Sequence, residues 1–70
     1  MNLKDLRKKK KLTQAQASKI LEITSQYLSL IETGDRNPSD RVKDKMCNLY
    51  NCSINDIFLA IKSTKRQKND

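Results

Sequence analysis

Residues 12–31 of the chain, LTQAQASKILEITSQYLSLI, are the segment around which the rest of the sequence is organised. It contains two threonines, Thr13 and Thr24, and each stands directly before a run in which apolar residues recur at helical spacing. An apolar residue precedes each threonine and another follows four positions after it, which is the hydrophobic staple that fixes how the chain enters a helix. The stretch therefore predicts two short helices, residues 14–21 and 25–33, joined by a tight turn.

A helix pair this short cannot bury its apolar side alone, so the rest of the chain must cover it. The residues expected to face inward are Ala17, Ser18, Leu21, Leu28 and Ile31. Two of them are small, which suits a close crossing of the two helices. The second helix keeps an outward side made of Ser25, Gln26, Ser29 and Leu30.

Three further helices are expected outside this pair, over residues 3–10, about 39–50 and about 54–61. Their N-caps are Asn2, either Ser39 or Asn37, and Ser53. Their apolar stripes are Leu3 and Leu6; Val42, Met46, Leu49 and Tyr50; and Ile54, Ile57, Phe58 and Ile61. We expect left-handed residues to end two helices, at Gly34 and at Asn51. The prediction is an all-α, compact five-helix domain over residues 1–61, followed by a basic, flexible tail over residues 62–70.

The composition favours a polyanionic partner. The chain has 70 residues, which allows one domain, and 15 Lys and Arg against 8 Asp and Glu give a net charge of +7. Nucleic acid is the simplest partner for such an excess, and an anionic membrane surface also qualifies. No apolar run approaches the roughly 20 residues that cross a bilayer. The N-terminal charges follow a helical pattern and precede no apolar segment, so we expect no signal peptide and a cytoplasmic location.

The residue types that support enzymatic chemistry are scarce. The chain has no histidine and no Gly-rich phosphate loop. Cys47 and Cys52 are not spaced as a CxxC motif, and two thiols without further ligands cannot complete a zinc site. We expect both to be buried, reduced and packed as small apolar side chains. The sequence therefore predicts no catalytic residue, no cofactor and no metal.

Two short capped helices around a tight turn are the arrangement with which a helix-turn-helix docks on DNA. The second helix then enters the major groove and its first turn reaches the base edges. Gln26 can bond adenine N6 and N7 together, and one such pair contributes about 1–3 kcal/mol of discrimination. Ser25 bonds several bases and discriminates less. Leu30, one turn after Gln26, is placed to cover a thymine methyl group.

The stretch LTQAQASKILEITSQYLSLIETGDRNP is similar to the Cro/repressor-type (Xre) helix-turn-helix family. The residues in register with that family's pattern are Thr13, Gln14, Leu21, Ile23, Tyr27, Leu28, Ser29, Ile31, Glu32, Gly34, Arg36 and Pro38. The resemblance extends over about residues 3–58. It implies a lambda-repressor-like fold and binding to double-stranded DNA.

The resemblance also implies roles for individual residues. The base-reading positions are Ser25, Gln26, Ser29 and Leu30. The phosphate-contacting positions are Gln14, Thr24, Tyr27, Thr33, Arg36 and Asn37. Gln14 is further expected to brace the second helix of the pair. Arg7 and Glu32 fall where the family has a structural ion pair.

The chain departs from the family pattern where the two helices meet. Ala17 replaces a core leucine, and Ile20 is the candidate to fill the space. Glu22 and Lys11 stand where the family has glycine, and each costs roughly 1 kcal/mol if the left-handed backbone is kept. Asp40 replaces an arginine or an apolar residue of some relatives; Arg41 and Lys43 are the candidates to supply the missing DNA contact.

The resemblance and the charge together predict a sequence-specific transcriptional regulator, a repressor, of bacterial or phage origin. It would bind a palindromic operator as a homodimer, with Tyr50, Leu59, Ile61 and the tail as candidates for the dimer surface. The alternative is an antitoxin-type protein that binds a partner protein through residues 54–61 and the tail as well as DNA. A controller protein of a restriction system is a further variant of the regulator.

Overall fold

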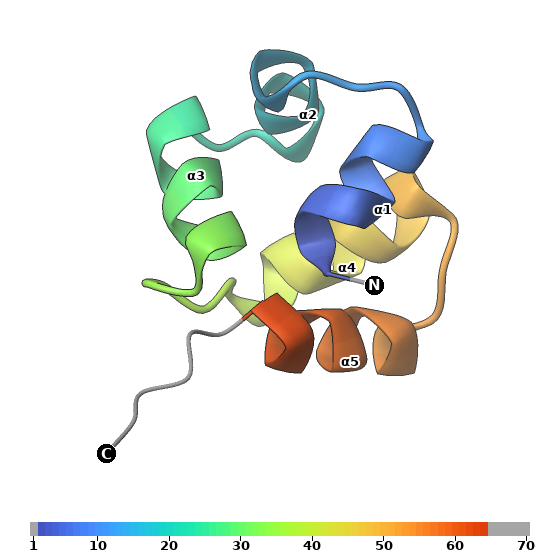
Figure 1. Cartoon of the computed structure of the whole chain (residues 1–70). Helices are drawn as coiled ribbons and strands as arrows, with labels where there is room; N and C mark the ends of the chain where they lie inside the picture. Colours follow the sequence, from blue (N-terminus) through green and yellow to red (C-terminus); the bar gives the residue numbers. More distant parts are fainter. Residues whose placement is uncertain (1, 65–70) are drawn as a thin grey trace.

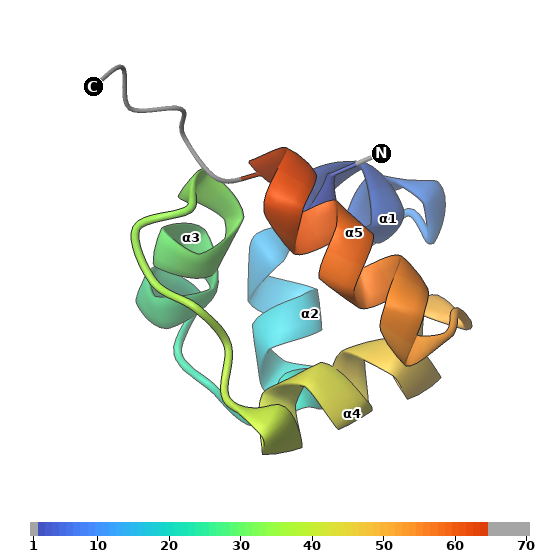
Figure 2. The same cartoon turned by 90° about the horizontal axis from the view of Figure 1, so that it is seen from below.

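The computed structural model describes residues 2–64, which fold into five α-helices and the turns that connect them. They are α1 (Leu3–Lys9), α2 (Gln14–Leu21), α3 (Ser25–Thr33), α4 (Asp40–Tyr50) and α5 (Ile54–Thr64). The helices surround one core, and α3 lies at the edge of the bundle in both views (Figures 1 and 2). The prediction of an all-α, five-helix domain is confirmed for this part of the chain.

Side-chain caps define where the first four helices begin. Asn2, Thr13, Thr24 and Ser39 each accept a hydrogen bond from the backbone N–H three residues on. Ser39, and not Asn37, therefore caps α4. Reciprocal capping boxes close the starts of α1, α2 and α5, where the third residue returns the bond to the cap backbone. Such caps satisfy N–H groups that a helix leaves unpaired, so the starts follow from local sequence.

The turns after the helices contain left-handed backbone. Gly34 has a φ of 89° and Asn51 a φ of 55°, which confirms both as helix terminators. Lys11 and Glu22 also have positive φ, 58° and 63°, so they keep the glycine-like conformation without being glycine. Each position costs roughly 1 kcal/mol compared with glycine. The Glu22 carboxylate lies 2.5 Å from Lys45 Nζ, which ties the α2–α3 turn to α4.

The core is formed by one cluster of buried apolar side chains from all five helices. Its members are Leu3, Ala17, Leu21, Leu28, Ile31, Val42, Met46, Tyr50, Ile57 and Ala60. Ser18 is buried beside them, so the predicted inward residues of α2 and α3 are confirmed. The prediction that Ile20 fills the space beside Ala17 is wrong, because Ile20 is 54% exposed. Helical phase places it on the flank of α2, next to Lys45 and Leu49.

Helix α5 differs from its prediction in length and in orientation. It continues to Thr64, so residues 62–64 belong to a helix and not to the predicted tail. The remaining tail, 65–70, lies outside the described residues. Ile57 and Ala60 are buried, whereas Ile54 and Phe58, predicted on the inner stripe, are each 53% exposed. The buried face of α5 therefore contains Ile57 and Ala60, where the small Ala60 side chain allows a close approach to the core.

Tyr50 was a candidate both for the inner stripe of α4 and for a dimer surface. Its residue is only 4% exposed, so the first assignment is confirmed and the second is wrong. The cysteines are free thiols, and both are half-buried against the core, less covered than expected.

Candidate nucleic-acid interface

Helices α2 and α3 form a compact hairpin with a fixed turn. The N–H of Ile23 donates to the Ser18 carbonyl over 2.9 Å, which closes α2 after the left-handed Glu22. The Thr24 side chain then caps α3 through the N–H of Tyr27, over 3.0 Å. Hydrogen bonds tie one end of the turn to α2 and the other end to α3. The turn therefore has a fixed conformation, which sets the angle between the two helices. The outer side of α3 faces away from the other helices (Figure 1).

The four predicted base-reading residues lie together on α3. Ser25 and Gln26 are exposed in its first turn, and Ser29 and Leu30 are half-buried one turn later. Within residues 2–64, no side chain bonds to the polar ends of Ser25, Gln26 or Ser29, so these groups keep their capacity for an external partner. Leu30 adds an apolar group beside them.

A buried ion pair holds the far end of α3 to α1. Arg7 Nε donates to Glu32 Oε2 over 2.7 Å and Nη2 donates to Oε1 over 3.1 Å, with the two side chains only 7% and 3% exposed. A third donor, Arg7 Nη1, bonds the Leu12 carbonyl over 2.8 Å. The planar guanidinium matches a carboxylate with two parallel bonds, so this contact sets orientation as well as distance. Arg7 thereby joins α1, the α1–α2 loop and α3.

Gln14 completes the same cluster from the first turn of α2. Its Nε2 donates to Glu32 Oε1 over 3.1 Å. The carboxylate of Glu32 thus accepts bonds from α1 and from α2 while it belongs to α3. The structure brings Arg7, Gln14 and Glu32 into one network, and this hydrogen bond fits the bracing role that the resemblance implied for Gln14.

The remaining candidates for phosphate contact lie along one border of α3. The Tyr27 hydroxyl donates to the Asn37 carbonyl over 3.5 Å, which connects α3 to the loop before α4. Thr33 Oγ1 lies 2.9 Å from Asp35 Oδ2 and 3.1 Å from the Leu30 carbonyl, so its one proton is already engaged within the chain. Arg36 and Asn37 are exposed in the loop. Tyr27 lies in the first turn of α3 and Thr33 in its last, and Arg36 and Asn37 follow the C-terminus of the helix. Gln14 also meets the C-terminal end of α3, through its bond to Glu32.

The charged side chains proposed to replace the family's missing contact are not equivalent. Lys43 lies 3.8 Å from Asp40, the acidic residue that stands in the place of an arginine. The Lys45 hydrogen bond, then the charge of Lys45 and last that of exposed Arg41, lower the pKa of Glu22. Lys43 and Arg41 thus each lie near a carboxylate of this chain.

No residue pattern in the sequence predicts three of these contacts. The Leu12 carbonyl bond, the Glu22–Lys45 pair and the Thr33–Asp35 bond all depend on how the chain packs or turns. The Asn2–Asp5 capping box could have been recognised, because an Asn followed three residues later by an acid has the required spacing.

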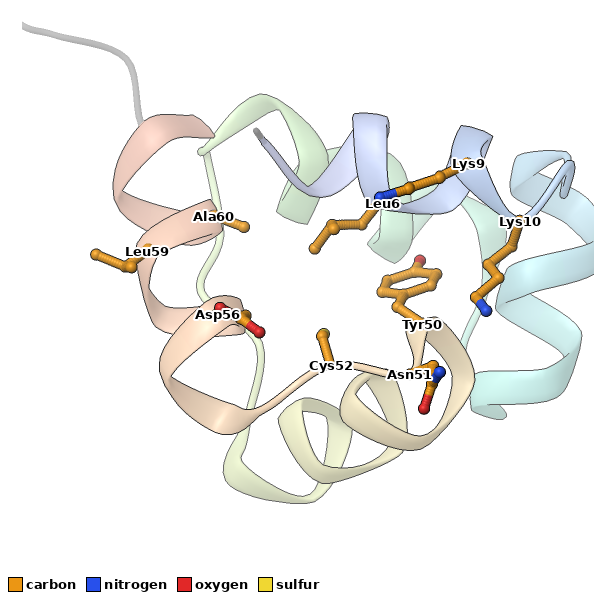
Figure 3. Close-up of a pocket in the computed structure, with 9 residues that line it drawn as sticks. All are labelled: Leu6, Lys9, Lys10, Tyr50, Asn51, Cys52, Asp56, Leu59 and Ala60. Atoms are coloured by element: carbon orange, nitrogen blue, oxygen red, sulfur yellow. The ribbon is translucent and has the colours of Figure 1, made fainter.

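A cavity of about 630 Å³ lies between α1, the end of α4 and α5 (Figure 3). It is lined by Leu6, Lys9, Lys10, Tyr50, Asn51, Cys52, Asp56, Leu59 and Ala60. Burial, and then the negative charge of Glu32, raises the pKa of Tyr50 to about 12. The Tyr50 hydroxyl is buried and has no hydrogen-bond partner within the described residues. It is therefore a neutral, unsatisfied group close to the Arg7–Glu32 pair.

Comparison with known proteins identifies the family of this chain. A helix-turn-helix family model matches residues 3–57, most of the chain. No curated protein and no solved structure matches the chain. Within residues 2–64, none of the helices is both long and apolar enough to cross a bilayer. The five-helix arrangement is a lambda-repressor-like fold, and such domains typically regulate and bind DNA rather than catalyse reactions. The chain belongs to the Cro/C1-type helix-turn-helix family of DNA-binding transcriptional regulators.

Proposed function

We propose that this chain is a sequence-specific repressor of bacterial or phage origin, acting in the cytoplasm, that inserts α3 into the major groove of its operator. Ser25, Gln26, Ser29 and Leu30 would contact the base edges. The observation that supports this proposal is the contrast between the two sides of α3. Its outer side presents polar groups without partners in the described chain, while Glu32 at its far end is anchored by Arg7 and Gln14. A rigid helix with a free polar face is what direct readout requires.

Contacts to phosphate would fix the register of α3 without specifying sequence. The proposed residues are Gln14, Thr24, Tyr27, Thr33, Arg36 and Asn37. Arg36 is the most direct candidate, because it is exposed and carries a full charge. Thr33 is the weakest donor among them, because its proton is shared with acceptors of its own helix end.

The operator is proposed to be palindromic and bound by a homodimer. A single domain of this size covers too little DNA for tight specific binding, and two half-sites about one helical turn apart are the usual solution. Leu59, half-exposed on α5, and Ile61 beside the core remain candidates for the dimer surface. Tyr50 is removed from this set by its burial.

A second function is supported by one feature of α5. Ile54, Phe58 and Leu59 are each 53% exposed, an unusual amount of apolar surface for one short helix. An antitoxin-type protein would use α5 and the tail to bind a partner protein while α3 binds DNA. A controller protein of a restriction system would bind DNA only, as the repressor does. Isolation of the chain from its host with a second protein at fixed stoichiometry would favour the antitoxin.

The experiment that tests the proposed function is selection of bound duplexes from random DNA, read by sequencing. The expected result is one enriched motif with two inverted half-sites spaced by about one helical turn. A single enriched half-site would contradict the homodimer. The absence of any enriched motif, with binding intact, would contradict sequence-specific regulation and leave a non-specific DNA-binding protein.

A further inference from the structure

The two cysteines lie on either side of the left-handed end of α4. Asn51 ends the helix, and the N–H of Cys52 donates to the Cys47 carbonyl over 3.1 Å. This bond is the six-to-one closure of a Schellman motif, in which the side chains at these two positions commonly pack against each other. The local backbone therefore brings both thiols to one corner, between α4 and α5.

The surroundings of both thiols agree with this placement. Both side chains pack against the same core and both are free. Burial raises the pKa of the Cys47 thiol, and the charges of Asp44 and Asp56 raise it further. Burial also raises the pKa of Cys52, and the next cause is the charge of Cys47 itself. The charge of Cys47 thus acts on Cys52, and the raised pKa values keep both thiols protonated at neutral pH.

A small molecule can reach Cys52 from solvent. Cys52 lines the cavity between α1, α4 and α5, and its side chain points into it beside the Tyr50 ring (Figure 3). The cavity volume of about 630 Å³ is within the range of sites for small molecules. The same corner lies on the opposite side of the bundle from α3 in both views (Figures 1 and 2). A group bound there would leave the DNA-reading side uncovered.

The number of protein side chains available as ligands restricts which metal or reagent could bind at this corner. Zinc takes four protein ligands in a structural site, and residues 2–64 contain no group of three or more His, Cys, Asp or Glu side chains placed to share a metal. Asp56, which lines the same cavity as Cys52, already accepts the N–H of Ser53 over 3.2 Å. A disulfide would need an oxidant and a narrow separation of the Cβ atoms. A soft centre bonded to two thiols needs no further protein ligand and no oxidant, and it spans a wider separation of the two sulfur atoms than the direct bond of a disulfide.

We propose that Cys47 and Cys52 together form a site for thiophilic compounds of trivalent arsenic, with one arsenic atom bridging both sulfur atoms. For an organoarsenic oxide, each sulfur forms one arsenic–sulfur bond and gives up its proton. The two protons leave with the oxide oxygen as one molecule of water, and arsenic remains trivalent, so no oxidant or reductant takes part. The second bond forms within one molecule, which raises its effective concentration and makes the bridge far more stable than a single bond.

The test uses the full chain, phenylarsine oxide as the probe and intact-mass spectrometry. The expected product carries one phenylarsenic group in place of two hydrogen atoms, and neither thiol then reacts with iodoacetamide. Addition of 2,3-dimercaptopropanol should release the group and restore two alkylation sites. Alkylation of both cysteines despite excess probe, or attachment of two separate arsenic groups, would overturn the proposal.

Two matched variants show whether both thiols are needed. Cys47→Ser and Cys52→Ser each leave one thiol, and each should hold the probe at least about 100-fold more weakly than the unchanged chain. Equal retention by either variant would overturn the bridge. If a serine variant loses its helical circular dichroism, the alkylation count of the unchanged chain still decides the question. DNA binding is measured separately, so failure of this proposal and failure of the proposed function give different results.

Discussion

Arg7 and Glu32, 25 positions apart, are joined by two hydrogen bonds in a nearly water-free contact between α1 and α3. Glu32 stands in the last turn of α3, where the helix dipole disfavours a negative charge. The guanidinium of Arg7 compensates for this position and for burial. Helix α3 is therefore held in place by a residue from the first helix of the chain.

Replacing Glu32 with alanine should destabilise the domain by about 3–5 kcal/mol, because Arg7 would keep a buried charge without a partner. The matched control is Asp35→Ala, which removes an exposed acid bonded to Thr33. Urea denaturation followed by circular dichroism measures both. Equal losses in the two variants would show that the Arg7–Glu32 pair has no special role in stability.

Lys11→Gly should stabilise the fold slightly, by less than about 1 kcal/mol. The gain arises because Lys11 has a φ of 58°, and glycine adopts that conformation without steric strain. The greater freedom of glycine in the unfolded chain offsets part of it. The control is Lys10→Gly, where φ is −91° and glycine should only destabilise. A lower thermal midpoint for Lys11→Gly than for Lys10→Gly would contradict this reasoning.

Tyr50→Phe should make the protein more resistant to alkaline unfolding. The folded pKa of Tyr50 is raised to about 12, above the value of about 10 in an unfolded chain. The folded state then binds more protons than the unfolded state, so its stability falls as pH rises above about 10. The variant lacks this loss and also lacks an unsatisfied buried hydroxyl. Parallel stability curves for both proteins between pH 9 and about 12 would contradict the assignment.

Affinity for DNA should fall steeply with salt, on the order of 10³-fold between about 50 and 200 mM, if some six phosphates are neutralised. Arg36→Gln should reduce the slope of log affinity against log salt by about 1 for each Arg36 engaged, with little change in sequence preference. Fluorescence anisotropy with the selected operator measures both. A salt-independent affinity would mean that the net charge of +7 serves another partner.

The helix limits were predictable because they depend on local chemistry. Thr13 and Thr24 bond their own helix starts, so their positions predicted where α2 and α3 begin. The face that α5 buries was not predictable from its pattern. Apolar residues occur on several sides of that helix, and packing against its neighbours selected Ala60 over Phe58.

In the candidate interface, too, some features were predictable from the sequence and others were not. The position of Gln26 on the outer side of α3 follows from helical spacing, and the structure places it there, exposed. The bond from Arg7 to the Leu12 carbonyl depends on a loop conformation that no residue pattern specifies. Which base Gln26 would contact depends on the operator sequence as well as on this side chain.

Substitution of Gln26 tests whether the outer side of α3 reads bases. Gln26 is exposed and without a partner among the described side chains, so Gln26→Ala should leave the fold unchanged. Its affinity would be measured against the selected operator and against every single-base variant of one half-site. We expect a loss of about 1–3 kcal/mol on the operator, with discrimination relaxed at one base pair only. An equal loss on every sequence, or none on the operator, would contradict the assignment of this face.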